Sequence, residues 1–267
     1  MPPPSPCPPE LSAAIARVAP RLGRLASPLH FYDRIGSTND IAIALATEGL
    51  VVVAAEQTAG RGRRGHVWFS PPGSGLYTSV VLAPSRAAVD PARATRLLTL
   101  AVGVGVAEGI EAATGLRADL KWPNDLLVAR RKLAGILAEA SVADQPIDTV
   151  TVGCGINVGP MAYPPELRDR ATSLESELGR AVEIYDVLAE TLAGIAARYA
   201  DLVAARFDAI LDAWRARAPA AVGARVAWTA GSRALQGVTA GIDADGALLV
   251  RVDDRVERIV SGELTWT

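Results

Sequence analysis

The sequence feature that most constrains the fold is a long apolar stretch at residues 91–114, PARATRLLTLAVGVGVAEGIEAAT. Pro91 suits the first turn of a helix. Because apolar residues occur on all faces of such a helix, other elements have to cover it. Its longest stretch without a charged residue, LLTLAVGVGVA, is shorter than the ~18 residues of a membrane span. We predict a buried core helix in a globular protein that does not cross a membrane.

Shorter patterns surround this helix. Helical spacing predicts helices over Leu11–Leu25, from Ser37 or Thr38 to Gly49, and as one continuous segment over 182–217, which Pro219 ends. Compact apolar runs predict strands. These runs lie at residues 51–57, 76–84, 117–123, 125–140 and 148–159. From Val222 the pattern changes to short alternating strands with glycine turns, which predicts a small β-barrel-like module.

Composition excludes several classes of protein. The net charge of −2 and isoelectric point near 5.8 argue against a protein that coats nucleic acid. Cys7 and Cys154 form no C-x-x-C motif, and His30 and His66 alone cannot supply a histidine cluster, so we predict neither disulfides nor a zinc site. The first ten residues, MPPPSPCPPE, lack the features of a signal peptide and suggest a mobile tail. We expect a reducing, cytoplasmic location.

The glycine–arginine loop, GRGRRG at residues 60–65, suits an anion, because glycine allows close backbone approach and arginine matches carboxylate or phosphate. It matches G-x-G-x-x-G, but HVWFSPPGSG follows instead of a helix, and the chain lacks kinase H-R-D, D-F-G and P-loop motifs. Three interpretations remain, namely a solvated turn, an RNA-binding loop and a lid over an anionic ligand. Trp68 and Phe69 directly after the loop favour the lid.

Lysine and asparagine are rare, which makes their positions informative. Only Lys121 and Lys132 are lysines, while the other 25 cationic residues are arginines. Lys132 follows two arginines for which a solvated hairpin turn is the better interpretation. Lysine at this position indicates a need for a compact charge that can contact two oxygen atoms. Asn124 and Asp125, in KWPND, supply an amide and a carboxylate behind the rigid Pro123.

Taken in order, these motifs resemble those of the biotin protein ligases. The resemblance runs from about residue 31 to the end through STN, QTAGRGRRG, KWPND, RKLAGIL and GINV. It implies an α+β fold with a mixed central sheet flanked by helices and a C-terminal SH3-like β-barrel. We expect a tail and short helix at 1–30, a catalytic domain at 31–219 and the barrel at 220–267. Regulatory members carry an N-terminal DNA-binding domain, for which residues before 30 leave no room, so the chain resembles the monofunctional type.

The family activity would be ATP-dependent formation of biotinyl-5′-AMP from biotin and MgATP. A lysine of the apo biotin carboxyl carrier protein, as in acetyl-CoA carboxylase, would then take the biotinyl group. The resemblance assigns catalysis to Lys132, Arg63 and Asp125. It assigns biotin contacts to Ser37, Thr38, Asn39, Gln57, Gly60, Arg61, Gly62, Arg63, Trp68, Lys132 and Gly135. It assigns ATP phosphates to Arg63, Lys121, Asn124, Lys132 and Asn157, with Mg²⁺ held mainly through those phosphates.

Two rival functions stay open at the level of sequence. Lipoate or octanoate transfer uses the same logic of carboxylate activation and lysine acylation, but an alkyl chain needs no polar ring site, so STN and Gln57 favour biotin. A non-catalytic nucleotide- or RNA-binding protein is the alternative from another class, and the acidic isoelectric point weighs against it. We expect no DNA or membrane partner, and the sequence leaves open a homodimer through a sheet edge.

Overall fold

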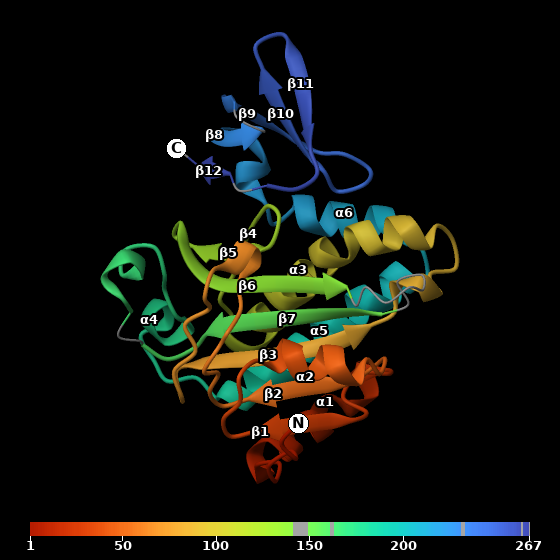
Figure 1. Cartoon of the computed structure of the whole chain (residues 1–267), viewed down its shortest axis with the longest axis vertical. Coiled ribbons are helices and arrows are strands. Elements are labelled where there is room, and N and C mark those ends of the chain that lie inside the picture. Colours follow the sequence, from red (N-terminus) through yellow and green to blue (C-terminus); the bar gives the residue numbers. More distant parts are fainter. Residues whose placement is uncertain (141–148, 161–162, 231–232, 263, 267) are drawn as a thin grey trace.

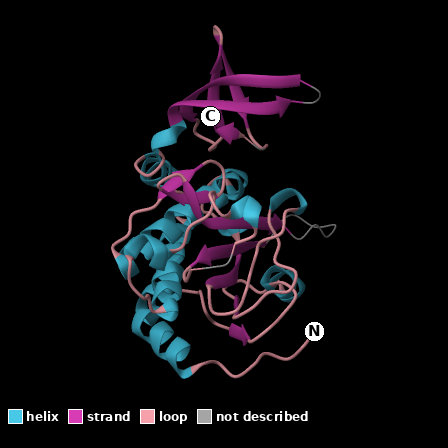
Figure 2. Ribbon diagram, turned by 90° about the vertical axis from the view of Figure 1, so that its left-hand side faces the viewer, coloured by secondary structure: helices cyan, strands magenta, loops and turns pink. Residues whose placement is uncertain are grey.

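A computed structural model of the chain describes residues 1–140, 149–160, 163–230, 233–262 and 264–266. Two sheets organise these residues (Figure 1). Figure 2 shows the long helices along one side of the larger sheet and many loops on the other. The smaller sheet lies at one end of the molecule, where the chain terminates (Figure 1).

The larger sheet has seven strands in the order β1-β2-β3-β7-β6-β5-β4. Strands β1 and β2 pair in parallel and the other neighbours are antiparallel, so the predicted mixed sheet is confirmed. The strands are β1 (Leu29–Tyr32), β2 (Val51–Ala54), β3 (Gly75–Leu82), β4 (Asp119–Lys121), β5 (Asp125–Val128), β6 (Arg131–Ala140) and β7 (Val150–Asn157).

Helix α3 (Pro91–Thr114) is the predicted core helix, with the predicted bounds. It packs on α5 (Ile184–Val203) at glycines, because a Cβ on Gly105 would lie 2.7 Å from the backbone of Gly194. By length and composition α3 alone among the described helices could cross a membrane, but 72% of its apolar window is buried inside the protein. A core helix passes the same test.

The predicted continuous helix over 182–217 is wrong. Helix α5 ends at Val203 and α6 (Phe207–Arg215) begins after a break. Ala205 takes a left-handed conformation, with φ of 56°, which turns the chain out of the helix. The apolar spacing continues across this break because both helices bury a face against α3.

Two other helix predictions need correction at their ends. Helix α2 (Thr38–Leu45) stops before Gly49, because Ala46 is left-handed and donates its N–H to the Ala42 carbonyl. Helix α1 (Pro9–Leu22) starts and ends earlier than Leu11–Leu25.

The segment expected to be a mobile tail has a defined path. Ser5 forms an antiparallel bridge with Phe31, donating its N–H to the Phe31 carbonyl at 2.8 Å. The segment therefore lies along β1, the edge strand of the larger sheet. An edge strand offers unpaired backbone groups, and this contact satisfies one of them.

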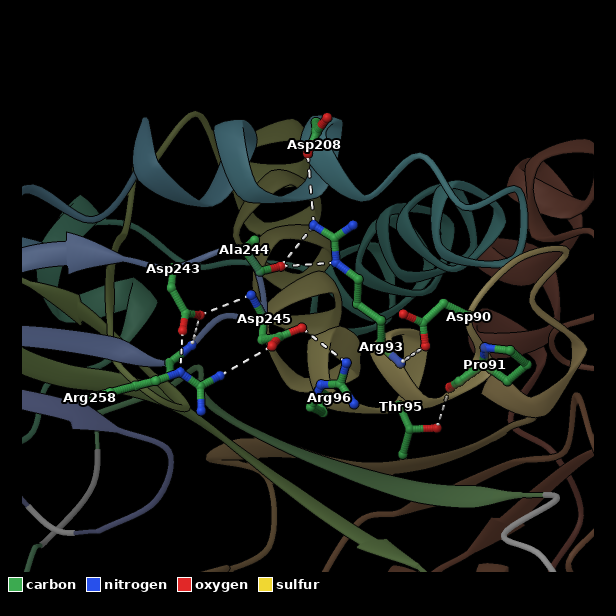
Figure 3. A network of polar contacts seen from close by, with 11 residues as sticks. Asp90, Pro91, Arg93, Thr95, Arg96, Asp208, Asp243, Ala244, Asp245 and Arg258 are labelled. Atoms are coloured by element: carbon green, nitrogen blue, oxygen red, sulfur yellow. Dashed lines mark hydrogen bonds and ion pairs between the residues drawn. The ribbon is translucent and has the colours of Figure 1, made fainter.

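The predicted C-terminal β-module is a five-stranded antiparallel sheet in the order β11-β10-β9-β8-β12. Its turn at residues 243–246 contacts the N-terminal part of α3 through arginine–aspartate and arginine–carbonyl bonds (Figure 3). The strands are β8 (Val222–Ala230), β9 (Arg233–Ile242), β10 (Leu248–Val252), β11 (Arg255–Ile259) and β12 (Thr265–Trp266).

Candidate functional site

The predicted site residues lie on β4 to β7, in the turn between β4 and β5, at the start of α2 and in the segment 57–68 that contains the glycine–arginine loop. At one end, the polar side chains of Thr38, Asn39, Gln57, Ser70 and Ser79 form what we call the buried amide network. Thr38 donates its backbone N–H (2.9 Å) and hydroxyl (3.1 Å) to Gln57 Oε1. The Ser79 hydroxyl lies 2.7 Å from Thr38 Oγ1 and 2.6 Å from Asn39 Oδ1. The side chains of this network are neutral and bond to one another.

The network changes the role expected for Ser37. Ser37, one of the two predicted starts, is the N-cap of α2, but its side chain makes no capping hydrogen bond. The Thr38 backbone N–H donates to the Gln57 side chain, and this bond links the start of α2 to the segment that leads into the glycine–arginine loop. Ser37 is buried beside the network.

Glycines on β6 and β7 give side chains room to lie directly on the sheet. A Cβ on Gly153 would lie 2.3 Å from Asn39 Oδ1, and one on Gly155 would lie 2.3 Å from the Trp68 ring. Gly135, paired with Gly155 across the two strands, would place its Cβ 2.9 Å from the same ring. The GCGIN and LAGIL motifs therefore supply a flat floor under Asn39 and Trp68.

The glycine–arginine loop is a compact hairpin. Arg61 and Val67 form an antiparallel β-bridge, and Trp68 donates its backbone N–H to the Gly60 carbonyl at 2.9 Å. Arg64 at the tip is left-handed, with φ of 56°. Gly60 has no space for a side chain, because a Cβ there would lie 2.5 Å from the Trp68 carbonyl oxygen. Of the three interpretations, this geometry suits a lid, since the loop carries Trp68 onto the glycine floor.

Arg61 ties the loop to the buried amide network through two carboxylates. Its Nη2 lies 2.8 Å from Asp40 Oδ1 and 2.9 Å from Glu139 Oε2. Glu139 also accepts a hydrogen bond of 2.6 Å from Asn39 Nδ2. Glu139 therefore contacts both the network and the loop.

At the other end lies the charged corner, which we define as Arg63, Asn124, Asp125 and Lys132. Lys132 Nζ is 2.7 Å from Asp125 Oδ1 and 5.3 Å from the centroid of the Trp68 ring. Arg63 donates to Asn124 Oδ1 at 3.1 Å, and Asn124 Nδ2 donates to the Ile136 carbonyl at 2.9 Å. Lys132 lies at the start of β6. A cluster with two cations and one carboxylate suits an anionic ligand.

Two other predicted phosphate contacts border this corner, since Lys121 pairs with Asp125 across β4 and β5 and Asn157 contacts the Lys132 backbone. Lys121, on β4, has its Nζ 5.5 Å from the centroid of the Trp266 ring of β12. Asn157 is buried, and its Nδ2 donates to the carbonyls of Thr172 (2.9 Å) and Lys132 (3.3 Å). Asn157 therefore fixes the backbone that carries Lys132, and its role at a phosphate stays a prediction.

The predicted hairpin between β5 and β6 explains the neighbouring arginines. Ala129 and Arg130 both have positive φ and form its turn, so Arg130 lies exposed as expected. Arg131 forms an ion pair with Glu177 at 2.7 Å rather than remaining fully solvated.

Sequence reasoning missed Ser79 and Glu139. Ser79 is completely buried in the mainly apolar β3, and Glu139 is the one carboxylate of β6. A polar residue in a strand that must be buried signals a partner, and this signal was available. The partners themselves come from α2, which only the tertiary structure places there.

Other titratable groups near the site are chemically quiet. Burial raises the pKa of the Cys154 thiol to about 12, which makes Cys154 an unreactive core residue. Burial also raises the pKa of Tyr163 to about 12, and its hydroxyl donates to the Thr172 carbonyl. Within the described part of the chain, no group of three His, Cys, Asp or Glu side chains could hold a metal ion.

Comparisons with known proteins agree with this geometry. Residues 31–157 match the biotin/lipoate A/B protein ligase family, and residues 222–264 match the biotin protein ligase C terminal domain. The chain is 36% identical over 231 residues to a biotin–[acetyl-CoA-carboxylase] ligase from Paracoccus denitrificans, covering 82% of this chain and 92% of the relative. It is 35% identical over 263 residues to the bifunctional ligase/repressor BirA of Bacillus spizizenii, covering 96% of this chain and 79% of that protein.

Solved structures show the same relationship. A biotin protein ligase from Aquifex aeolicus, in complex with biotin and ATP, superposes with a TM-score of 0.77 at 29% identity. The match covers 90% of this chain and 98% of the Aquifex chain. The chain therefore belongs to the biotin protein ligase family.

Proposed function

We propose that this protein activates biotin with ATP as biotinyl-5′-AMP and transfers the biotinyl group to a lysine of a carboxyl carrier protein domain. The observation that carries the proposal is the charged corner, where Lys132 and Arg63 lie beside Trp68 and the glycine floor. A carboxylate and an α-phosphate are both anionic and repel one another. Two cations at this position would neutralise that repulsion while the loop holds the reactants together.

In the first step, a carboxylate oxygen of biotin attacks the α-phosphorus of ATP and pyrophosphate leaves. Lys132 would contact both the carboxylate and the α-phosphate, and Arg63 would contact the phosphate. Mg²⁺ would arrive with the triphosphate and neutralise part of its charge. Asn124 would keep Arg63 in place, because it already accepts a hydrogen bond from that guanidinium.

In the second step, the acceptor amine attacks the acyl carbon, AMP leaves and the amine loses a proton. Asp125 would orient this amine, and the contact of its Oδ1 with the Lys132 ammonium group at 2.7 Å supports this role. Water would hydrolyse the acyl-adenylate, so the glycine–arginine loop would also protect this intermediate by covering it. The two free cysteines accord with a reducing, cytoplasmic location.

The buried amide network supports biotin over an alkyl acid. Thr38, Asn39 and Gln57 are amide and hydroxyl groups held in a fixed array, which suits a ligand ring that both donates and accepts hydrogen bonds. The buried Nε1 of Trp68 has no hydrogen-bond partner among the described residues, so an acceptor on a ligand would satisfy it.

The test is incubation of the protein with biotin, MgATP and an apo carrier domain, followed by mass spectrometry. We expect the carrier to gain one biotinyl group, and biotin to drive exchange of labelled pyrophosphate into ATP. Parallel reactions with lipoate and octanoate test the related activity. Salt-sensitive RNA affinity without pyrophosphate exchange would instead identify a binding protein.

A further inference from the structure

The C-terminal sheet contacts the catalytic motif KWPND directly. The turn at residues 243–246 joins β9 to β10, and the carbonyl of Gly246 accepts a hydrogen bond of 2.9 Å from Nε1 of Trp122. Trp122 is 3% exposed, so this bond is shielded from water. Only Pro123 separates Trp122 from Asn124 and Asp125 of the charged corner.

The turn itself is firmly held. Asp243 accepts hydrogen bonds of 2.9 Å from the backbone N–H groups of Asp245 and Ala247, which closes the turn from within. Gly246 has φ of 79°, and a Cβ there would lie 2.7 Å from Leu100 of α3. The backbone of the turn therefore lies against α3 at a distance that only glycine allows.

Arginines fix the turn from three sides (Figure 3). Arg93 grips the Ala244 carbonyl with Nε at 3.0 Å and Nη2 at 2.9 Å. Arg96 contacts one oxygen of Asp245 at 3.0 Å, and Arg258 contacts the other at 3.2 Å. Arg93 and Arg96 belong to α3, so the turn is bound to the core helix on which the larger sheet also packs.

We propose that the 243–246 turn is a positioning element for adenylation. Gly246 holds Trp122, and Trp122 holds Asn124 and Asp125 where they meet Arg63 and Lys132. This inference rests on the proposed function. It gives the C-terminal sheet a defined role in the first chemical step, which is to set the geometry of the charged corner without contacting the reactants.

The position of Asn124 is the part most sensitive to such a displacement. Asn124 exchanges backbone and side-chain hydrogen bonds of 2.9 Å with Ile136 while its Oδ1 accepts from Arg63. A rotation of Trp122 would move Asn124 relative to Arg63 before it reached the buried amide network, which lies on other elements. Loss of the hydrogen bond between Trp122 and Gly246 should therefore weaken the binding and reaction of ATP and leave the affinity for biotin unchanged.

Trp122→Phe keeps an aromatic ring and removes the N–H donor. We expect kcat for biotin-dependent pyrophosphate exchange to fall roughly 10- to 100-fold and KM for ATP to rise, because small misplacements of reacting groups have effects of this size. The Kd for biotin should stay within about twofold of the wild-type value. Gly246→Ala, which pushes the turn away from Leu100, should reproduce this pattern with the tryptophan intact.

Three variants complete the design. Ile110→Val trims a fully buried residue of α3 away from the turn, so it lowers the melting temperature and should leave kcat unchanged. Arg96→Gln removes one of two arginines on Asp245 and should change kcat by less than about twofold. Arg93→Lys weakens the contact of the partly exposed Arg93 side chain with the Ala244 carbonyl. If Trp122→Phe and Gly246→Ala do not fold, this variant tests the same effect on kcat and on KM for ATP, with a smaller expected change.

The outcomes separate cleanly. The positioning role would be overturned if Trp122→Phe had the wild-type kcat and KM for ATP. If Trp122→Phe does not fold, the same result in Arg93→Lys would overturn it. A lowered melting temperature with unchanged kinetics, as in Ile110→Val, would also overturn it, because the bond would then be purely structural. Absence of biotin-dependent exchange in the wild-type protein would overturn the proposed function instead.

Discussion

The buried amide network and the charged corner lie at opposite ends of one site and are built differently. Asn39 in the network is 3% exposed and bonded to its neighbours, whereas the Lys132 side chain in the corner is 35% exposed. The network is preformed and neutral, so a ligand ring would meet groups that need no reorganisation. The corner keeps its charges accessible, which suits phosphates that enter and leave. The difference predicts separate effects on binding and on chemistry.

The largest expected effect comes from Lys132→Arg in the charged corner. Arginine keeps the charge, but its planar fork cannot place one nitrogen between two oxygen atoms as the Lys132 ammonium can. We expect adenylation to slow by about 3 to 4 kcal/mol of barrier, on the order of 10²- to 10³-fold. Biotin-dependent pyrophosphate exchange measures this rate.

The matched control is Arg131→Lys, at the adjacent position of β6, where the side chain pairs with Glu177. This variant should exchange pyrophosphate at the wild-type rate. If Lys132→Arg exchanged pyrophosphate at the wild-type rate, the charged corner would not need a lysine for adenylation.

The second effect belongs to the buried amide network. Asn39→Ala removes the hydrogen bonds of Asn39 to the Ser79 hydroxyl and the Glu139 carboxylate, which keep Thr38 and Arg61 as partners. At about 0.5 to 1.5 kcal/mol each, loss of the two bonds costs about 1 to 3 kcal/mol. We expect biotin to bind roughly five- to hundredfold more weakly, while kcat at saturating biotin changes little. Calorimetric titration with biotin measures the affinity.

Thr47→Ala, at the exposed segment just after α2, controls for a general effect on this region. A fall in kcat with unchanged biotin affinity in Asn39→Ala would mean that the two ends do not divide binding from chemistry.

The third prediction concerns retention of the intermediate. Arg63→Gly removes the guanidinium that joins the glycine–arginine loop to Asn124. Loss of one charged hydrogen bond, about 1.5 kcal/mol, should raise escape of the acyl-adenylate roughly tenfold. Labelling of bystander lysines on an added protein measures the escape.

Arg64→Gly is the comparison variant, because Arg64 is exposed at the tip of the loop and its left-handed conformation accepts glycine. Equal retention of the intermediate by Arg63→Gly and the wild-type protein would argue against a lid.

The smallest expected effect concerns Asp243, which lies outside both the network and the corner. The question is how its contribution to the free energy of unfolding depends on pH. Burial alone would raise the pKa of Asp243, but hydrogen bonds from Arg258 and from two backbone N–H groups hold that pKa below its ordinary value. The stabilisation is therefore fully present above the unfolded pKa of about 3.9. It is lost as the pH falls through the lower pKa of the folded protein.

Asp243→Asn keeps an oxygen acceptor and removes the charge. We expect it to lower the free energy of unfolding by roughly 0.2 to 1 kcal/mol at neutral pH, with the difference closing as the pH falls below the unfolded pKa of about 3.9. Thermal melting across pH measures it, with Asp212→Asn, in an exposed pair with Arg215, as the control. A difference that stays constant with pH would mean that charge is not what Asp243 contributes.

Particular residues show how far the sequence reaches. The core helix 91–114 has the predicted bounds because its apolar pattern and Pro91 are local signals. The single helix predicted over 182–217 was wrong at Ala205, because a left-handed alanine leaves no mark in hydrophobic spacing. The rarity of lysine singled out Lys132, and the structure pairs it with the predicted Asp125. Ser79 and Glu139 were missed because their partners lie far away in the chain.

The sequence by itself determined the order of elements, the glycine floor motifs and the set of candidate site residues, because periodicity and residue chemistry are local properties. Tertiary structure alone decided which groups meet. Lys132 reaches Asp125 across a hairpin, Glu139 joins Asn39 to Arg61, and Gly246 reaches Trp122 from another sheet. Such contacts depend on register and packing between distant segments, and hydrophobic pattern does not encode them one by one.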